Sequence, residues 1–319
     1  MPSPFEIYDL LQDYASGTET AREVVIGLVW TYCEAEACGL AMSPGIPTRT
    51  LPWAGRLRGK TVAELSAWVR EFEPYQATVG MAAVNAAINR RHGLPDGLSL
   101  APGAQSNLAV FEHFLPQILA KKIVVIGRYP GLEAFVKQHQ LDLTVLERTS
   151  GPGDLTDAAC EFLLPEAEWV FLTASSIPNK TFPRLAELSR DATTVLMGPT
   201  TPWLPDLHHF GIDFLAGVEI ANRDMLRATV AEGGGVRLFD EAVGYRVAAL
   251  GNREAVAWTK QLIAQTAIEK DTLTRAMDDW YEQGKAARFP RYAELETANR
   301  RLSRLDTCFK RLWDANLDG

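Results

Sequence analysis

Small hydroxyl and amide side chains gather in two short segments, each directly after an apolar run. Residues 173–181, TASSIPNKT, complete the run WVFLT, and residues 198–202, GPTTP, complete TTVLMG. If these runs are parallel strands, both segments lie outside the carboxyl ends of the strands, where open α/β sheets bind ligands. Helix capping explains one such residue and not five. We therefore predict a small-molecule site. Its candidate ligand-binding residues here are Thr173, Ser175, Asn179, Lys180, Thr181, Gly198, Pro199 and Thr200.

A third polar segment follows the apolar run KIVVIG and consists of Gly127, Arg128, Tyr129 and Pro130. A helix is expected after it, and the free backbone N–H groups of a helix start can hold an anion. The segment is not G-x-G-x-x-G, which weakens a standard dinucleotide site, and Arg128 could instead supply charge to an anionic ligand. Glu147 ends the next run, where an acid often binds a ribose; a solvated acid beside Arg148 is the competing interpretation.

Five apolar runs begin 20–26 residues apart and alternate with helical segments, which predicts a parallel sheet with helices on both faces. The runs are 122–127, 143–147, 169–173, 193–198 and 213–217, and the helical segments are 131–139, 156–164, 180–190 and 221–231. Earlier in the chain, residues 22–32 and 37–42 are expected to form two strands of a hairpin, with helices at 61–70 and 76–90. Small residues of the second helix, which carries Asn85, favour tight packing.

Composition limits the function classes. The 319 residues carry a net charge of −8, which argues against nucleic acid as the main partner. No run of 18 apolar residues occurs, so no membrane span is expected, and the acidic N-terminal segment favours a cytoplasmic protein. The cysteines, Cys33, Cys38, Cys160 and Cys308, are too scattered for a disulfide scaffold or a zinc knuckle, and the adjacent His208 and His209 cannot easily share one ion.

The last part of the chain is helical and charged. A stripe of Leu295, Ala298, Leu302, Leu305, Phe309 and Leu312 predicts an amphipathic helix over residues 291–313. Its partner is either the 253–282 helix of the same chain or a second subunit in a homodimer. Because Gly284 lies in the break between the helices, the sequence favours an antiparallel return. Residues 285–311 carry eight basic and three acidic side chains, a net charge of +5.

The motifs KKIVVIGRYPGLE, LTVLER, LLPEAEWVFLTASSIPNKTFPRLAELS and VLMGPTTPWLPDLHHFGIDFLAG, in this order, resemble the putative heavy-metal-chelation family. GLAMSP, LRGKTVAEL and ATVGMAAVNAAIN are similar to its smaller domain. The resemblance implies an enolase N-terminal-like domain before a Rossmann-like domain, and a site between them. The matching positions are Asn85, Gly127, Pro130, Glu147, Thr173, Asn179, Lys180, Thr181, Gly198, Pro199, Pro202 and Gly217. Asn179 replaces the Asp of some relatives, which removes a possible hard-metal ligand.

We therefore expect an α/β protein with an N-terminal α+β domain (1–105), a Rossmann-like domain (106–250) and a helical C-terminal extension (251–319). The leading function is binding of a small anionic metabolite, or of a heavy metal carried by such a chelator, between the two domains. One alternative is an enzyme with a nucleotide-like cofactor, in which Glu147 binds the ribose and Lys180 acts as acid, base or charge stabiliser. Another is an assembly or regulatory partner that acts through the C-terminal helices.

Overall fold

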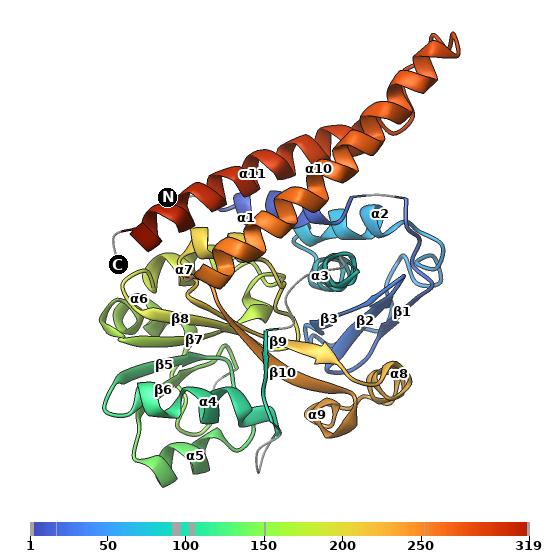
Figure 1. Cartoon of the computed structure of the whole chain (residues 1–319). Coiled ribbons are helices and arrows are strands. Elements are labelled where there is room, and N and C mark those ends of the chain that lie inside the picture. The colour runs from blue at the N-terminus through green and yellow to red at the C-terminus, as the bar shows by residue number, and fades with distance from the viewer. Residues whose placement is uncertain are drawn as a thin grey trace.

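The computed structural model describes residues 3–16, 18–90, 97–101, 106–149, 151–251 and 253–317. It contains a three-stranded antiparallel sheet, a seven-stranded and mostly parallel sheet, and two long C-terminal helices (Figure 1). The α/β fold class expected from the sequence is confirmed. No helix among the described residues is long and apolar enough to cross a membrane.

The first sheet has the strand order β1-β2-β3, with one helix before it in the chain and three helical segments after it. Gly27 interrupts the strand expected over 22–32, because its N–H bonds to the carbonyl of Trp30 in a tight turn. A Cβ at Gly27 would lie 2.2 Å from the carbonyl oxygen of Val230, so only glycine fits. Two strands therefore replace one. The elements of this part are α1 (Glu6–Tyr14), β1 (Glu23–Ile26), β2 (Trp30–Glu34), β3 (Cys38–Met42), α2 (Val62–Ser66), η1 (Ala67–Arg70) and α3 (Pro74–Asn89).

Helix α3 packs unusually closely on β3 and η1, as its small residues predict. A Cβ on Gly39 of β3 would lie 2.1 Å from the Ala82 carbonyl oxygen of α3, and one on Gly80 would lie 2.2 Å from the Val69 amide nitrogen. Backbones can approach this closely only where side chains are absent. The contact fixes Asn85, on the same helix, against the middle of β3.

The second sheet has the strand order β4-β10-β9-β8-β7-β5-β6. The five strands expected from the sequence are present, pair in parallel, and are joined at one edge by two antiparallel strands that the sequence analysis missed. Leu98 and Ser99 of β4 lie in the segment expected to belong to the first domain. The strands are β4 (Leu98–Ser99), β5 (Lys122–Ile126), β6 (Asp142–Leu146), β7 (Trp169–Thr173), β8 (Thr193–Met197), β9 (Phe214–Ile220) and β10 (Val243–Ala249).

Both faces of the second sheet are covered. Val124 of β5 belongs to a core shared with α1 and α3, whereas its neighbour Val125 belongs to a core with Phe111 and Phe114 of α4. This alternation explains why the parallel strands are continuous apolar runs in the sequence. The surrounding helices are η2 (Ser106–Leu108), α4 (Ala109–Ile118), α5 (Leu132–His139), η3 (Asp157–Ala159), α6 (Cys160–Leu163), η4 (Leu164–Glu166), η5 (Ala174–Ser176), α7 (Phe182–Leu188), η6 (Pro205–Phe210), α8 (Arg223–Ala231) and α9 (Leu238–Glu241).

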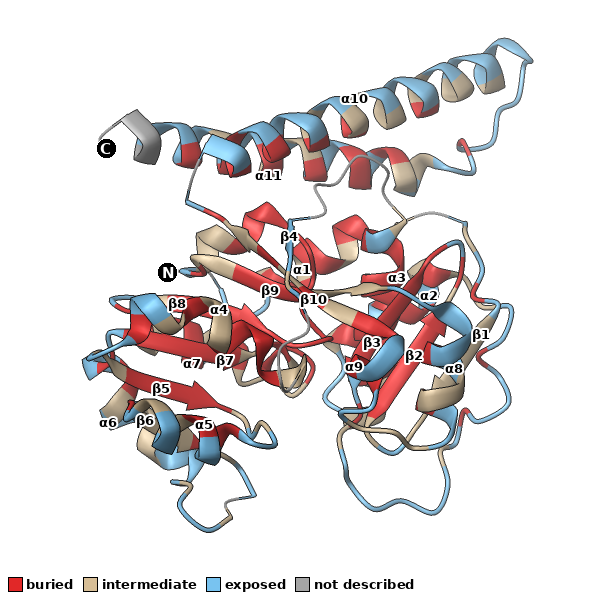
Figure 2. Ribbon diagram, turned by 60° about the horizontal axis from the view of Figure 1, so that its bottom comes forward, coloured by how far each residue is buried: buried red, intermediate tan, exposed pale blue. Residues whose placement is uncertain are grey.

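The chain ends in a helical hairpin of α10 (Arg253–Glu282) and α11 (Tyr292–Leu317). The antiparallel return expected around Gly284 is confirmed: this residue has φ +72°, and the two helices pack along their length (Figure 1). Leu295, Ala298, Leu305 and Leu312 are buried, so the apolar stripe is covered by α10 and the body of the same chain. Near the turn, the hairpin projects beyond the body and its surface is mostly exposed or half-buried (Figure 2).

Candidate functional site

The switch point of the second sheet lies between β5 and β7, because the chain runs from β5 outward to β6 and then returns to the other side of β5. The loops that leave these two strands touch each other. The Thr173 hydroxyl shares hydrogen bonds with the Tyr129 side chain and with Ser175 Oγ, the latter at 3.0 Å. Gly127 has φ +102°, and a Cβ there would lie 3.3 Å from the Thr173 side chain. Four of the expected site residues therefore meet at the position where open sheets bind ligands.

Glu147 closes the outer side of this loop cluster. Its carboxylate accepts the backbone N–H of Arg128 at 3.0 Å and that of Arg148 at 2.9 Å. The Arg128 guanidinium pairs with Asp154, and this hydrogen bond raises the pKa of Arg128 and lowers that of Asp154. Asn107 donates to the Pro130 carbonyl at 2.8 Å. The ligand roles expected for Glu147 and Arg128 stay predictions, and in this structure both side chains hold the loop together.

Asn85 joins the two sheets. Its Nδ2 donates to the Leu40 carbonyl of β3 at 2.8 Å and to the Thr200 carbonyl, in the loop after β8, at 3.0 Å. The Thr200 hydroxyl in turn accepts the N–H of Met42 at 2.9 Å. We call the region formed by Met42, Asn85, Gly198, Thr200 and Thr201 the junction site. The sequence had selected three of these five residues, Asn85, Gly198 and Thr200.

The junction site has unsatisfied polar atoms and free space. In the part of the chain that the structure describes, Asn85 Oδ1 and Thr201 Oγ1 are buried without a hydrogen-bond partner. Both side chains are more than nine-tenths buried. Gly198, also buried, has φ +105°, yet a Cβ built on it would find no atom within 4 Å. Pro199 follows it and is buried as well. The backbone of the β8 loop therefore borders a space that no described side chain fills.

The second half of the 173–181 segment contacts the first sheet's helices. Asn179 Oδ1 accepts the N–H and the hydroxyl of Thr181 at 3.0 and 2.7 Å. The Lys180 ammonium bonds to the Val69 carbonyl of η1 and lies 4.3 Å from the centre of the Tyr8 ring. Burial lowers the pKa of Lys180 to about 8. A charge contribution of Lys180 to a ligand stays a prediction; here its ammonium fastens the loop to the helices.

Arg246 was not predicted from the sequence, and Thr201 was included only as part of the polar segment 198–202. Arg246 lies on β10, a strand that was not predicted, and its guanidinium stacks 4.0 Å above the ring of Trp203. Gly217 pairs with Arg246 in the sheet. A Cβ built on Gly217 would lie 3.6 Å from the Cβ of Thr201, so the missing side chain leaves room for Thr201 and Trp203. The alternation Val243, Tyr245, Val247 could have revealed the strand. Arg246 adds a positive charge beside the loop after β8.

The residues do not fit direct binding of a heavy metal. Among the described residues, no group of three or more His, Cys, Asp or Glu side chains could hold a metal ion. Cys33 and Cys38 belong to different cores on opposite faces of the small sheet. Burial raises the pKa of the Cys33 and Cys308 thiols to about 12, and it also raises those of Cys38 and Cys160. Metals bind the thiolate, which these surroundings disfavour.

The fold and these contacts define a class of two-sheet α/β proteins with polar loops at the carboxyl edge of the parallel sheet. The chain belongs to a family whose two models, both described as "Putative heavy-metal chelation", match residues 8–88 and 109–249. The family resemblance stated from the sequence is thereby confirmed. The matches end before α10, so the C-terminal hairpin lies outside them.

Two solved structures share this fold. A DUF364-family protein of unknown function from Desulfitobacterium hafniense is 28% identical, with a TM-score of 0.65 over 77% of this chain and 98% of that chain. Another of unknown function, from Pyrococcus horikoshii, is 20% identical, with a TM-score of 0.64 over 77% of this chain and 100% of that one. This second likeness concerns the fold alone. None of the curated proteins compared with the chain matches it.

Proposed function

We propose that the protein binds a small anionic metabolite, free or as the chelator of a heavy metal, at the junction site. The observation that carries the proposal is that Asn85 Oδ1 and Thr201 Oγ1 are buried and lack a hydrogen-bond partner among the described residues, while the backbone at Gly198, in the same loop as Thr201, borders open space. A buried polar atom without a partner costs about 1–3 kcal/mol. A ligand that forms hydrogen bonds with both atoms removes this cost. Ligand binding would therefore explain why the two polar side chains are present in the buried site.

The chemistry of these atoms limits the ligand. A side-chain amide oxygen only accepts hydrogen bonds, so the ligand carries an O–H or N–H group for Asn85. The Thr201 hydroxyl both donates and accepts. Arg246 supplies positive charge nearby, and exposed backbone at Gly198 allows close approach. These features together fit the anion of a hydroxy acid or an amino acid.

The family description points to metal, whereas the side chains of this chain offer poor metal ligands. The family description and the side chains agree if the metal reaches the protein already bound to the organic anion. The protein then recognises the chelator's oxygens and hydroxyl groups rather than the ion. The alternative of a nucleotide-like cofactor gains no support from Glu147, since both its oxygens accept backbone N–H groups of the protein.

A thermal-shift screen tests the proposal. Hydroxy acids and amino acids are added with and without a divalent or heavy metal, and metals are also added alone. At about 100 times its Kd, a ligand should stabilise the protein by roughly 2.7 kcal/mol. We expect at least one organic acid to raise the melting temperature of the wild type.

Thr201→Val supplies the matched variant. Since it removes a buried hydroxyl without a partner, it should leave the free protein as stable as the wild type or more stable, while it weakens the response to the ligand. Thr200→Val is a useful comparison, because Thr200 accepts a hydrogen bond from Met42 and its loss should lower stability. A response to metal alone, abolished by cysteine-to-serine variants, would overturn the proposal.

A further inference from the structure

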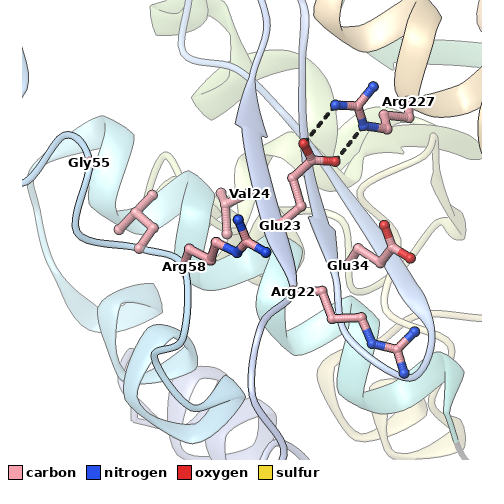
Figure 3. Close-up of a pocket in the computed structure, with 8 residues that line it drawn as sticks. Arg22, Glu23, Val24, Glu34, Gly55, Arg58 and Arg227 are labelled. Carbon is pink, nitrogen blue, oxygen red and sulfur yellow. Dashed lines mark hydrogen bonds and ion pairs between the residues drawn. The ribbon is translucent and has the colours of Figure 1, made fainter.

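A second pocket lies on the far side of the small sheet from the junction site. It has a volume of about 510 Å³ and lies around edge strand β1, whereas the junction site contacts β3, the opposite edge. Its charged lining residues come from three parts of the chain: the start of β1 and the end of β2, the loop before α2, and α8 (Figure 3). They are Arg22, Glu23, Glu34, Arg58 and Arg227.

One ion pair in the pocket connects the two sheets. Arg227 of α8 donates to both carboxylate oxygens of Glu23, at 2.5 and 2.8 Å. These hydrogen bonds, together with the charges of Arg227 and Arg58, lower the pKa of Glu23. Two parallel N–H···O bonds fix the geometry of both side chains. The wall formed by α8 is therefore held against β1 before any ligand arrives.

Two other guanidinium groups in the pocket have no such partner. Arg22 and Arg58 are exposed, and within the ranges that the structure describes neither forms an ion pair with a carboxylate. Glu23 bonds to Arg227 and also feels the charge of Arg58, and Glu34 is the second carboxylate of the lining, so three guanidinium groups face two carboxylates in the pocket. Figure 3 shows the Arg58 guanidinium beside Glu23 and Val24, whereas the Arg22 guanidinium extends on the Glu34 side of β1. The pocket thus presents two separated positive groups.

We propose that this pocket binds a compact molecule with two anionic groups, of the diphosphate type, which Arg22 and Arg58 hold at its two ends. Guanidinium groups match phosphate oxygens with paired hydrogen bonds. The volume falls within the roughly 300–1,000 Å³ of small-molecule sites. Val24 and Leu57 supply the apolar part of the lining, and the Glu34 carboxylate opposes the anion on one side.

The pocket is open to solvent, so binding should depend strongly on salt. Because α8 belongs to the segment of the second sheet and β1 to the first, the occupied pocket also bridges the two parts of the protein. This pocket is independent of the junction site, because the two sites have no lining residue in common.

Calorimetric titration of the full chain with inorganic pyrophosphate tests the proposal. We expect saturable binding in low-salt buffer that weakens as chloride is added. Arg22→Gln and Arg58→Gln should each weaken binding about tenfold or more, the cost of one charge-assisted contact. Neither variant should change the circular dichroism spectrum, because neither guanidinium has an ion-pair partner to lose in the described structure.

Three further variants make the outcome decisive. Arg275→Gln removes an exposed arginine of α10, far from the pocket in sequence and fold, and should leave the affinity unchanged. Glu34→Gln should strengthen binding, since it removes the opposing charge. Thr201→Val should have no effect. The proposal is overturned if pyrophosphate does not bind, if Arg275→Gln weakens it as much as the pocket variants, or if Thr201→Val abolishes it while the pocket variants do not.

Discussion

Arg301 offers the sharpest test of how the C-terminal hairpin is held. Its side chain, on α11, is 0% exposed and therefore buried with its charge. Nε and Nη2 donate to the Asp13 carbonyl at 2.9 and 2.7 Å, Nη2 also donates to Ser16 Oγ, and Nη1 bonds to Glu269 of α10 at 2.7 Å. One side chain thus connects α11 to both α10 and the end of α1.

Arg301→Ala removes all these bonds, including the ion pair with Glu269. Breaking a buried pair in this way costs about 3–5 kcal/mol. Because the Glu269 side chain is 35% exposed and can recover water, we expect the lower end, about 3 kcal/mol. A loss of this size makes the equilibrium constant for the opening of α11 roughly 100-fold larger in the variant than in the wild type.

Amide hydrogen exchange of α11 measures this opening directly. Protection in the middle of α11 should fall by about two orders of magnitude in Arg301→Ala. The neighbouring Arg300, with a side chain 55% exposed, bonds to the same Asp13, so Arg300→Ala is the control and should cost at most about 1 kcal/mol. Arg301→Lys, which keeps the charge without the fork, should fall between the two. Equal protection in Arg301→Ala and Arg300→Ala would refute the reasoning.

Three other changes test the remaining packing. The double variant Leu302→Asp and Leu305→Asp should undock α11, so that a protease cuts the loop between α10 and α11 and digests α11. Ile268→Asp, at a 68% exposed position of α10, should not have this effect. Equal digestion of the two variants would contradict the packing of α11. Burial raises the pKa of Asp206 from 3.8 to about 6, so its stabilising contribution is present below about pH 4 and is lost as the pH rises through 6. Asp206→Asn should therefore raise the melting temperature above that of the wild type by more at pH 7.5 than at pH 4. An equal difference in melting temperature at both pH values would contradict the raised pKa of Asp206. Gly39→Ala should lower the free energy of unfolding in urea by at least about 2 kcal/mol, because the new Cβ would collide with the backbone of α3; an unchanged midpoint would show that the close contact is wrong.

The sequence predicted the central sheet well because its strands are buried on both faces. Val124 and Val125 point into different cores, so an unbroken apolar run was the correct signal. Strand β10 was not predicted because its apolar residues alternate with Gly244 and Arg246 and do not form the unbroken apolar run of the parallel strands. The single strand expected over 22–32 was wrong for a reason invisible in local sequence: Gly27 must turn against a carbonyl of α8, two hundred residues later.

The candidate site was predictable only in part. Strand ends could be read from the sequence, which is why Thr173, Gly198 and Thr200 were selected. The partners could not, because Asn85 and Thr200 are 115 residues apart and meet only when the two sheets pack. Lys180 shows the same limit: in the sequence it is a free cation, whereas folding brings the Val69 carbonyl to it. The positions of the domain boundaries and the ligand roles of the individual residues stay predictions.

Hydrogen exchange with and without the organic acid identified by the screen shows whether this ligand occupies the junction site. We expect the ligand to slow exchange at the amides of Gly198, Thr200, Thr201 and Trp203 and in α3 around Asn85, in the wild type but not in Thr201→Val. Slower exchange confined to the β1 pocket or to the surroundings of the cysteines, with the junction site unchanged, would contradict it.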